Sequence, residues 1–235
     1  MRADAPAKRA LFPISVSNQA FSTRRVLPAL RAMVSTCTEV VVFIADHLQI
    51  YNKALQIADG AALPTIISEF AARQDYREQR GKWVQRIVSQ MQGTEAARWT
   101  TIGVDDISDG ACFGIFRNVM VAYYSVCRFR DDVDASAEHY ARSRDPHCPF
   151  GLRERLSRGY LLEEIALNVR LHVVDGIDDE YYMGEQSGLL LNLYNSKYGF
   201  DAFDLADVPS ARRPIRFFGL NGDPSEGWRE HPPAA

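Results

Sequence analysis

The sequence predicts an α/β fold, in which a mostly parallel sheet carries helices on both faces. Short apolar runs alternate with longer amphipathic segments along the chain, which is the order of parallel α/β folds. The run EVVVFIAD at residues 39–46 is apolar without alternation, as expected of a strand that is covered on both sides. In such sheets ligands bind beyond the carboxyl ends of the strands, where the strand order reverses.

In the first half of the chain we expect two strands and two helices. Residues 10–17, ALFPISVS, form a short buried strand, and Ser22 is a suitable N-cap for a helix over residues 23–35. The run at 39–46 is the second strand, and a loop with a short helical stretch follows it. Pro64 then begins a long helix that extends to about Gln92 and ends at a glycine.

The second half continues the alternation. The segment ARWTTIGVDD at 97–106 is a third strand, and helical patterns cover residues 110–144 and 150–174. SGLLLNLYNS at 187–196 predicts a final strand, and YGFDAFDLADV at 198–208 a terminal helix. We expect one domain over residues 1–209 and an irregular tail over residues 210–235, where Pro, Gly and Arg occur without periodicity.

Composition limits the class of protein. The 235 residues suffice for a sizeable core, and the hydrophobic share of 46% is ordinary for a soluble protein. No apolar run approaches the ~20 residues of a membrane span, and the N-terminus lacks the apolar core of a secretory signal. The four cysteines form no C-x-x-C pair, so we expect reduced thiols, a cytoplasmic protein and no metal site. The net charge of −3 leaves room only for a local basic face.

Several motifs are missing. The chain has no G-x-G-x-x-G and no G-x-x-x-x-G-K-[ST], so dinucleotide binding and P-loop phosphate binding have little support. It has no G-x-S-x-G elbow, which argues against a standard α/β-hydrolase. No motif surrounds any of the five histidines.

Polar residues stand at the ends of three predicted strands. Ser15, Asp46 and Tyr194 each lie at or just past a carboxyl end, so they are expected to meet at one rim of the sheet. Ser15 and Ser17 suit an ordinary turn, but a serine at this rim also suits a nucleophile. Because no histidine motif is present, the proton partner of such a serine is expected to be a tyrosine or a carboxylate.

The predicted helix at 150–174 offers such partners. Tyr160 and Glu164 are four residues apart and therefore share one face. Leu161 and Leu167 flank Glu164 at helical spacing and draw its carboxylate toward apolar surroundings. Periodicity alone favours the ordinary alternative, in which Tyr160 is a core aromatic residue and Glu164 a surface charge.

A basic stripe lies on the predicted helix at 64–92. Arg73, Arg77 and Arg80 follow the spacing of one helix face, and the same segment carries Lys82 and Arg86. Such a stripe is usually a solvated face, but it also suits the phosphates of a nucleic acid.

In this order the motifs resemble the tRNA-dependent cyclodipeptide synthases, from about Leu11 to about Asp204. ISVSNQAFS resembles the strand end that bears the family's nucleophilic serine, and VVFIADHLQIYNKA its Asp-containing strand end with Tyr-Asn. YLLEEIALNV resembles its Tyr-x-x-x-Glu helix, and LLLNLYN the strand with its last site tyrosine. The resemblance implies catalytic roles for Ser15, Tyr160, Glu164 and Tyr194, and substrate contacts for Asn18, Asp46, Tyr51 and Asn195. Asn195 stands where the two main branches of the family have His or Pro.

The resemblance also implies a fold and a reaction. The fold would be Rossmann-like, similar to the catalytic domain of class I aminoacyl-tRNA synthetases, but without ATP or another cofactor. The partners would be two aminoacyl-tRNAs, which bind the basic stripe and react in turn through an aminoacyl-enzyme on Ser15 to give a cyclodipeptide. A non-catalytic RNA-binding protein on the same fold and a serine esterase remain as alternatives. The two amino acids and the oligomeric state stay open.

Overall fold

The computed structural model describes residues 8–14, 23–34, 36–45, 68, 82–87, 89–90, 98–142, 150–183, 187–220 and 228–231, and the structural statements that follow concern these residues. Their strands form one sheet in the order β3-β2-β1-β4-β5-β6. Neighbouring strands are parallel, except that β6 runs antiparallel to β5. The bounds are β1 Arg9–Ile14, β2 Glu39–Ile44, β3 Arg98–Gly103, β4 Asp179–Tyr182, β5 Arg216–Gly219 and β6 Arg229–Glu230. The predicted mostly parallel, Rossmann-like α/β fold is confirmed.

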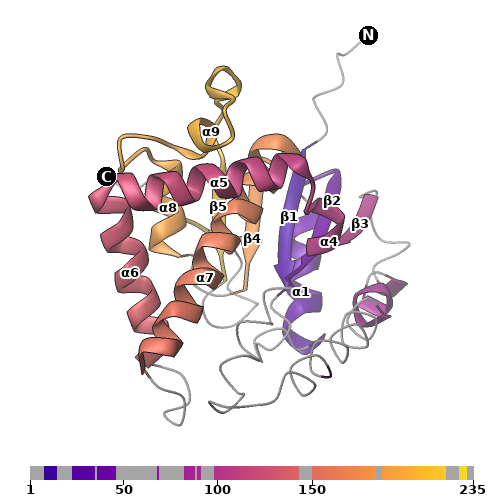
Figure 1. Cartoon of the computed structure of the whole chain (residues 1–235). Helices are drawn as coiled ribbons and strands as arrows, with labels where there is room; N and C mark the ends of the chain where they lie inside the picture. The colour runs from indigo at the N-terminus through magenta and orange to yellow at the C-terminus, as the bar shows by residue number, and fades with distance from the viewer. Residues whose placement is uncertain are drawn as a thin grey trace.

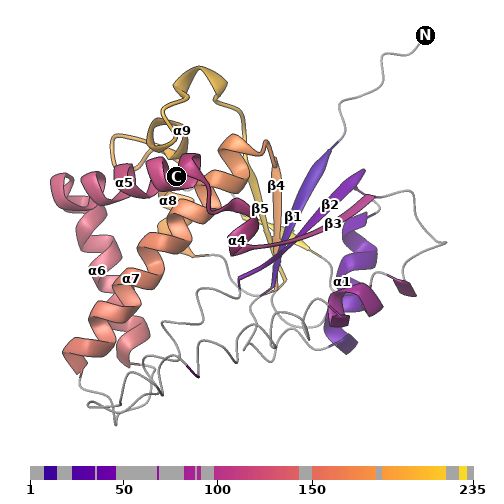
Figure 2. The ribbon, with the colours of Figure 1, turned by 45° about the vertical axis from the view of Figure 1, so that its right-hand side comes forward.

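Helices cover both faces of this sheet (Figures 1 and 2). α1 lies on one face, and α7 lies on the other, with α5 and α6 packed against α7. The bounds are α1 Thr23–Val34, α4 Val104–Ile107, α5 Gly110–Ser125, α6 Cys127–Arg142, α7 Phe150–Val169, α8 Gly188–Tyr194 and α9 Ala202–Leu205. A π-helical turn, η2 (Arg170–Val174), continues α7, and a 3-10 turn, η3 (Pro209–Ala211), follows α9.

Successive side chains of the central strands point to opposite faces of the sheet, so the buried core has one part on each face. Phe12 and Val42 pack toward α1, in a cluster that includes Met33. Leu11 and Phe43 point to the opposite face and pack with residues of α7 and η2. Each large side chain buried in this way contributes about 1.5–3 kcal/mol of hydrophobic free energy, so both faces hold the sheet between helices.

The strand order reverses between β1 and β4, and there the two strands separate. β1 stays paired with β2 along its whole length, to Ile14↔Ile44. Its pairing with β4 comprises only Ala10↔Asp179 and Leu11↔Glu180. Two residues later β1 contains Pro13, which has no N–H to donate to a neighbouring strand. The sheet is therefore forked at its carboxyl edge, between β1 and β4.

The first three strands and the first helix lie close to their predicted ranges, but the predicted strand at 187–196 is wrong. Gly188–Tyr194 is the helix α8, whose buried residues Leu189, Leu190 and Leu193 follow helical spacing. A short apolar run fits either a buried strand or a buried helix, and here the packing against α6 and α7 selects the helix.

The predicted irregular tail at 210–235 is wrong for two segments, because β5 and β6 belong to the sheet. Arg216 at the start of β5 forms two hydrogen bonds with the fully buried carboxylate of Asp179 on β4, at 2.8 and 2.9 Å. Trp228 donates a hydrogen bond to the carbonyl of Ala29 in α1 and packs against Phe12. This part of the chain therefore closes one side of the α1-facing core.

The remaining differences concern helix ends and one strand. The predicted helix at 110–144 is two helices, α5 and α6, which the extended backbone of Val126 separates. The predicted terminal helix is shorter, as α9, and the strand β4 has no counterpart among the predicted elements. Of the predicted helix at 64–92 the structure describes only residues 68, 82–87 and 89–90 as helical, and Ser22 lies outside the described residues.

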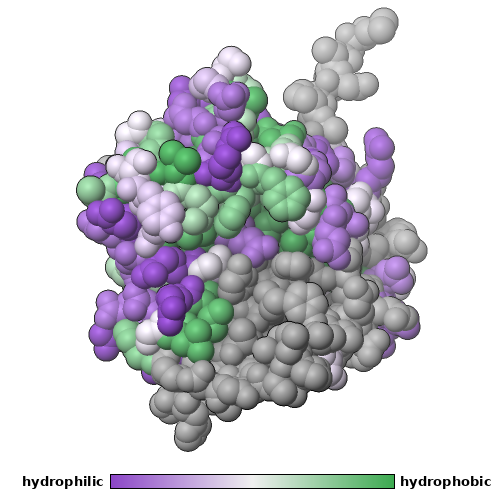
Figure 3. Space-filling model, viewed as in Figure 1, coloured by the Kyte–Doolittle hydropathy of each residue, from purple (hydrophilic) through white to green (hydrophobic). Residues whose placement is uncertain are grey.

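None of the described helices is both long enough and apolar enough to cross a membrane. The outer face of α5 exposes Phe113 and Val121, and Figure 3 shows hydrophobic residues in green along this helix.

Candidate active site

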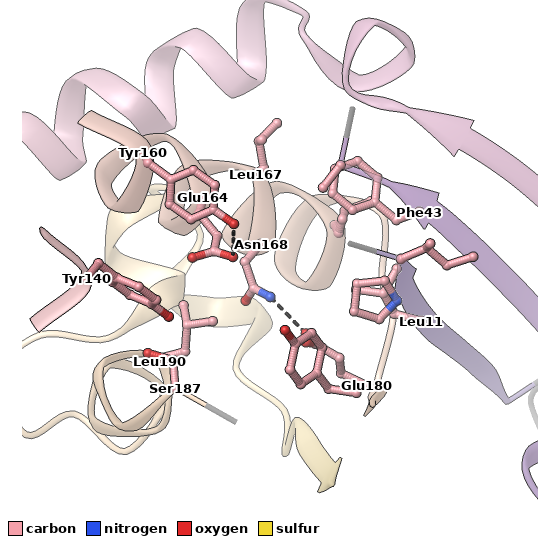
Figure 4. Close-up of a pocket in the computed structure, with 15 residues that line it drawn as sticks. Leu11, Phe43, Tyr140, Tyr160, Glu164, Leu167, Asn168, Glu180, Ser187 and Leu190 are labelled. Atoms are coloured by element: carbon pink, nitrogen blue, oxygen red, sulfur yellow. Dashed lines mark hydrogen bonds between the residues drawn. The ribbon is translucent and has the colours of Figure 1, made fainter. Parts of the chain in front are cut away.

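A cavity lies at the fork of the sheet, where β1 and β4 separate (Figure 4). Its walls combine apolar side chains with hydroxyl, amide and carboxyl groups. The position agrees with the rule that ligands of parallel sheets bind at the carboxyl edge, where the strand order reverses. The described residues that line it are Leu11, Pro13, Ile14, Phe43, Ala45, Tyr140, Tyr160, Glu164, Leu167, Asn168, Leu171, Glu180, Tyr182, Ser187 and Leu190.

Tyr160 and Glu164 meet in this cavity, as their spacing on one helix face predicts. The Tyr160 hydroxyl donates a hydrogen bond to Oε1 of Glu164 at 3.2 Å (Figure 4). Burial raises the pKa of Glu164 from 4.5 to about 7, the hydrogen bond from Tyr160 lowers that pKa, and the charge of Glu180 raises it. Burial likewise holds the pKa of the Tyr160 hydroxyl well above its usual value. Glu164 is thus a carboxyl group poised to exchange a proton near neutral pH.

Asn168 and Glu180 form a second polar pair on the same cavity wall. Asn168 lies one helix turn after Glu164, and its Nδ2 donates to Oε2 of Glu180 at 2.8 Å. The hydroxyl of Tyr194 donates to Oδ1 of Asn168 at 2.9 Å, so the amide presents its NH₂ group to the carboxyl. Asn168 and Glu180 are both buried, and each bond therefore fixes the position of a cavity group.

His172 holds Glu180 from within the protein. Its ring is fully buried in the π-helical turn η2, and it does not line the cavity. Nε2 lies 2.8 Å from Oε2 of Glu180, and Nδ1 lies 2.7 Å from the carbonyl oxygen of Ile177. A carbonyl oxygen only accepts, so Nδ1 carries a proton and the orientation of the ring is set.

The structure changes the position expected for the last site tyrosine. Tyr194 ends a helix, not a strand, and it is not among the described residues that line the cavity; its hydroxyl donates to Asn168 and its ring packs edge-on against His172. Asn195 donates to the carbonyl of Leu191 and so completes the end of α8. The tyrosine that ends a strand and lines the cavity is Tyr182, on β4. The signal for it in the sequence is the pair Tyr181-Tyr182, but the acidic residues before the pair favour a loop.

Several predicted site residues lie outside the described residues, namely Ser15, Asn18, Asp46 and Tyr51. Their described neighbours do reach the site. Ile14, the residue before Ser15, lines the cavity, and so does Ala45, the residue before Asp46. The strands β1 and β2 therefore lead to the cavity at the points where these predicted residues follow.

The basic stripe is described only in part, because Arg73, Arg77 and Arg80 lie outside the described residues. Lys82 and Arg86 are exposed on the helical segment 82–87, whose opposite side buries Val84 and Ile87 in the α1-facing core. Both described members of the stripe thus face solvent.

In the described part of the chain, no group of three or more His, Cys, Asp and Glu side chains is arranged to hold a metal ion. Cys37, Cys112 and Cys127 form no disulfide there.

Solved structures of cyclodipeptide synthases share this fold. A CDPS from Fluoribacter dumoffii aligns with a TM-score of 0.72 at 15% identity, over 91% of this chain and 89% of its own. AlbC, a cyclodipeptide synthase from Streptomyces noursei, aligns with a TM-score of 0.62 at 13% identity, over 94% of this chain and 97% of its own. A Mycobacterium tuberculosis protein, described as showing that cyclodipeptide synthetases are related to type I tRNA synthetases, aligns with a TM-score of 0.61 at 15% identity, over 80% and 78% of the two chains. The chain matches no protein-family model, and no curated protein sequence matches it closely. The chain therefore has the fold of the cyclodipeptide synthases, as its motifs predict.

Proposed function

We propose that the protein is a cyclodipeptide synthase, an aminoacyltransferase that joins the amino acids of two aminoacyl-tRNAs into a diketopiperazine. The observation that carries this proposal is the Tyr160–Glu164 pair in a cavity at the forked edge of the sheet, within a chain that has the cyclodipeptide synthase fold. The cavity borders the end of β1, which Ser15 follows in sequence.

The reaction begins with the transfer of one aminoacyl group. The Oγ of Ser15 attacks the ester carbonyl carbon of the first aminoacyl-tRNA, the bond from that carbon to the ribose oxygen breaks, and the serine proton ends on the released ribose hydroxyl. The amino group of the new aminoacyl-enzyme then attacks the ester carbonyl carbon of the second aminoacyl-tRNA, the bond from that carbon to the ribose oxygen breaks, and the amine gives up a proton as the second tRNA leaves with a free ribose hydroxyl. Finally the free amino group of the dipeptidyl ester attacks the Ser15 ester, so the ring closes and the serine regains its proton. The aminoacyl esters supply the energy, and the reaction uses no ATP.

Glu164 and Tyr160 act on the amino group of the acyl chain. An ammonium group must lose a proton before its nitrogen can attack a carbonyl carbon. The pKa of Glu164, raised by burial to about 7, suits a carboxyl that accepts this proton near neutral pH. Tyr160 is bonded to Glu164 and fixes its position, and Tyr182 at the end of β4 takes the place predicted for Tyr194.

Incubation with charged tRNA tests the proposal. The purified full chain should release uncharged tRNA, carry a transient aminoacyl ester and produce a cyclic dipeptide detectable by mass spectrometry. Binding of tRNA without product would support a non-catalytic RNA-binding protein instead. Hydrolysis of simple esters without any tRNA would support a serine esterase.

The basic stripe is proposed to bind the tRNA backbone. A triple variant that combines Arg73→Glu, Arg77→Glu and Arg80→Glu should bind tRNA more weakly. The slope of the logarithm of its binding constant against the logarithm of the salt concentration should be smaller by about 0.7 to 0.9 for each phosphate that the variant no longer neutralises. A matched control reverses Arg24 and Arg31, which are exposed on α1, and should leave the slope unchanged. A wild-type slope in the triple variant would identify the stripe as a solvated face.

A further inference from the structure

We propose that Asn168 and His172 are positioning residues, which bind Glu180 and so hold the end of β4 against the face of α7 that lines the cavity. The inference rests on the proposed function, because it concerns the geometry in which Glu164 and Tyr182 act on the acyl chain. This role requires neither positioning residue to touch the substrate.

The first argument is a polar stripe that continues along α7 beyond the pair that acts on the amino group. Tyr160, Glu164 and Asn168 follow one another at intervals of four residues, and all three line the cavity. His172 follows at the same interval in η2, and π-helical turns within helices often occur at functional sites. The first half of the stripe thus contains the groups that act on the acyl chain, and the second half contains the groups that bind β4.

The second argument is that β4 loses one neighbouring strand halfway along its length. Glu180 is the last residue of β4 that pairs with β1 in the described part of the chain, opposite Leu11. Beyond it, the described pairing of Tyr181 and Tyr182 is with β5 only. Alternate residues of a strand point to the same side, and Glu180 and Tyr182 accordingly both line the cavity. A bond at Glu180 therefore fixes β4 at the point from which Tyr182 extends into the fork.

The third argument is that two protein groups already bind the carboxyl group of Glu180. Nδ2 of Asn168 and Nε2 of His172 each lie 2.8 Å from its Oε2, and Figure 4 shows the first of these bonds. Nδ1 of His172 donates to the carbonyl of Ile177, so Nε2 either donates a proton to Oε2 or accepts one from it. One proton lies between the two atoms in both cases. The hydroxyl of Tyr194 donates to the amide oxygen of Asn168 and thereby turns its NH₂ group toward Glu180. These bonds suit a residue that fixes a strand, since they satisfy the carboxyl oxygen within the protein.

The experiment exchanges the donor and the acceptor of the bond between Asn168 and Glu180. Asn168→Asp alone removes the NH₂ donor and places a second carboxyl group against Glu180, so the bond is lost. Glu180→Gln in addition rebuilds the bond with opposite polarity. The amide NH₂ of residue 180 can then donate one hydrogen to the carboxylate of residue 168 and the other to Nε2 of a neutral His172. The hydroxyl of Tyr194 can still donate to residue 168, so the double variant regains each bond of the network.

Steady-state rates of cyclodipeptide formation by the full chain measure the effect. For Asn168→Asp, kcat should fall by about 10- to 100-fold, because a misplacement of about 1 Å between reacting groups can cost about 100-fold. KM for aminoacyl-tRNA should stay within about threefold, since the variant leaves the basic stripe unchanged. The double variant should recover kcat to within about fivefold of the wild type.

Two further measurements separate positioning from a general loss of structure. The matched control is Asn118→Asp, because Asn118 on α5 donates a comparable bond, 2.9 Å long, to the carbonyl of Leu205 and does not line the cavity. This control should keep kcat within about threefold of the wild type. Urea unfolding shows whether the bond is rebuilt, since the midpoint that Asn168→Asp loses should return in the double variant.

The outcomes distinguish this inference from the proposed function. A folded Asn168→Asp variant with the kcat of the wild type would overturn the inference and leave the proposed function in place, and so would a double variant as slow as the single one. Should Asn168→Asp fail to fold, the double variant decides, because it should fold and reach the stated rate; a double variant that is unfolded or slower overturns the inference. If the wild-type protein formed neither an aminoacyl adduct nor a cyclic product, the proposed function itself would be wrong.

Discussion

Replacing Glu164 by glutamine should have opposite effects on activity and on stability. Glu164→Gln keeps the shape of the side chain but cannot take a proton from the amino group of the acyl chain. Cyclodipeptide formation should therefore fall by about 100-fold or more, which is the typical contribution of a general base. The neighbouring Glu163→Gln lies about 100° around the helix and should change the rate by less than about threefold.

The effect on stability follows from the pKa of Glu164. Because burial raises the pKa from 4.5 to about 7, the folded protein binds more protons than the unfolded chain between these two values. The free energy of unfolding should thus fall as the pH rises from about 4.5 through about 7, and stay level above that. At about 1.4 kcal/mol per pKa unit the total is about 3 kcal/mol, an upper value because the side chain retains some exposure to solvent.

Urea unfolding at pH 5, 6, 7 and 8 measures this contribution. Glu164→Gln has no carboxyl to ionise, so its free energy of unfolding should vary less with pH and exceed that of the wild type at pH 8 by up to about 3 kcal/mol. Glu163→Gln should keep the wild-type dependence. The assignment of the buried proton to Glu164 would be refuted if Glu164→Gln retained the wild-type pH profile, or if Glu163→Gln lost it.

Three further predictions concern other parts of the molecule. Ser15→Ala should abolish both the aminoacyl adduct and the product, while Ser17→Ala should retain some of each; an adduct mapped to Ser17 by peptide mass spectrometry would contradict the alignment. Tyr182→Phe should slow acyl transfer by about tenfold. In the control Tyr181→Phe the replaced ring stacks on the α1-facing side of the sheet, so the rate of acyl transfer should change little, and steady-state rates of the two variants test this. Phe129→Ala should lower the free energy of unfolding by about 3–5 kcal/mol, because Phe129 is fully buried among the helices; a decrease below about 1 kcal/mol would show that the helical layer repacks.

Local pattern predicts those parts of the fold that depend on near neighbours in sequence. β2 is identified by its run of β-branched residues, and the Tyr160–Glu164 pair by its spacing of four residues. Each of these features depends on residues of a single strand or a single helix. α8 resembles a strand in sequence because its apolar run is too short for periodicity to decide.

The polar part of the site could not be predicted because its partners are distant in sequence. Asp179 and Glu180 begin a buried strand only because Lys8, Arg216 and His172 supply the ion pairs and hydrogen bonds that their carboxyl groups need. A sequence window around β4 contains neither Lys8 nor Arg216, so the acidic residues favour a loop there. The same reason explains why the sequence assigns the role of the last site tyrosine to Tyr194 and not to Tyr182.

The fork between β1 and β4 also bears on how the chain is made. β1 ends at residue 14 and β4 begins at residue 179, so 165 residues must leave the ribosome before the second half of the sheet can dock. At roughly 5–20 residues per second this takes roughly 10–30 s, during which the β4-facing edge of β1 has no partner. An unpaired edge of this kind invites pairing with a strand of another nascent chain, and a proline near its end interrupts the ladder that such a strand would form. Pro13, beyond which β1 is not paired with β4 in the finished sheet, is therefore expected to limit such pairing on the unfinished sheet as well.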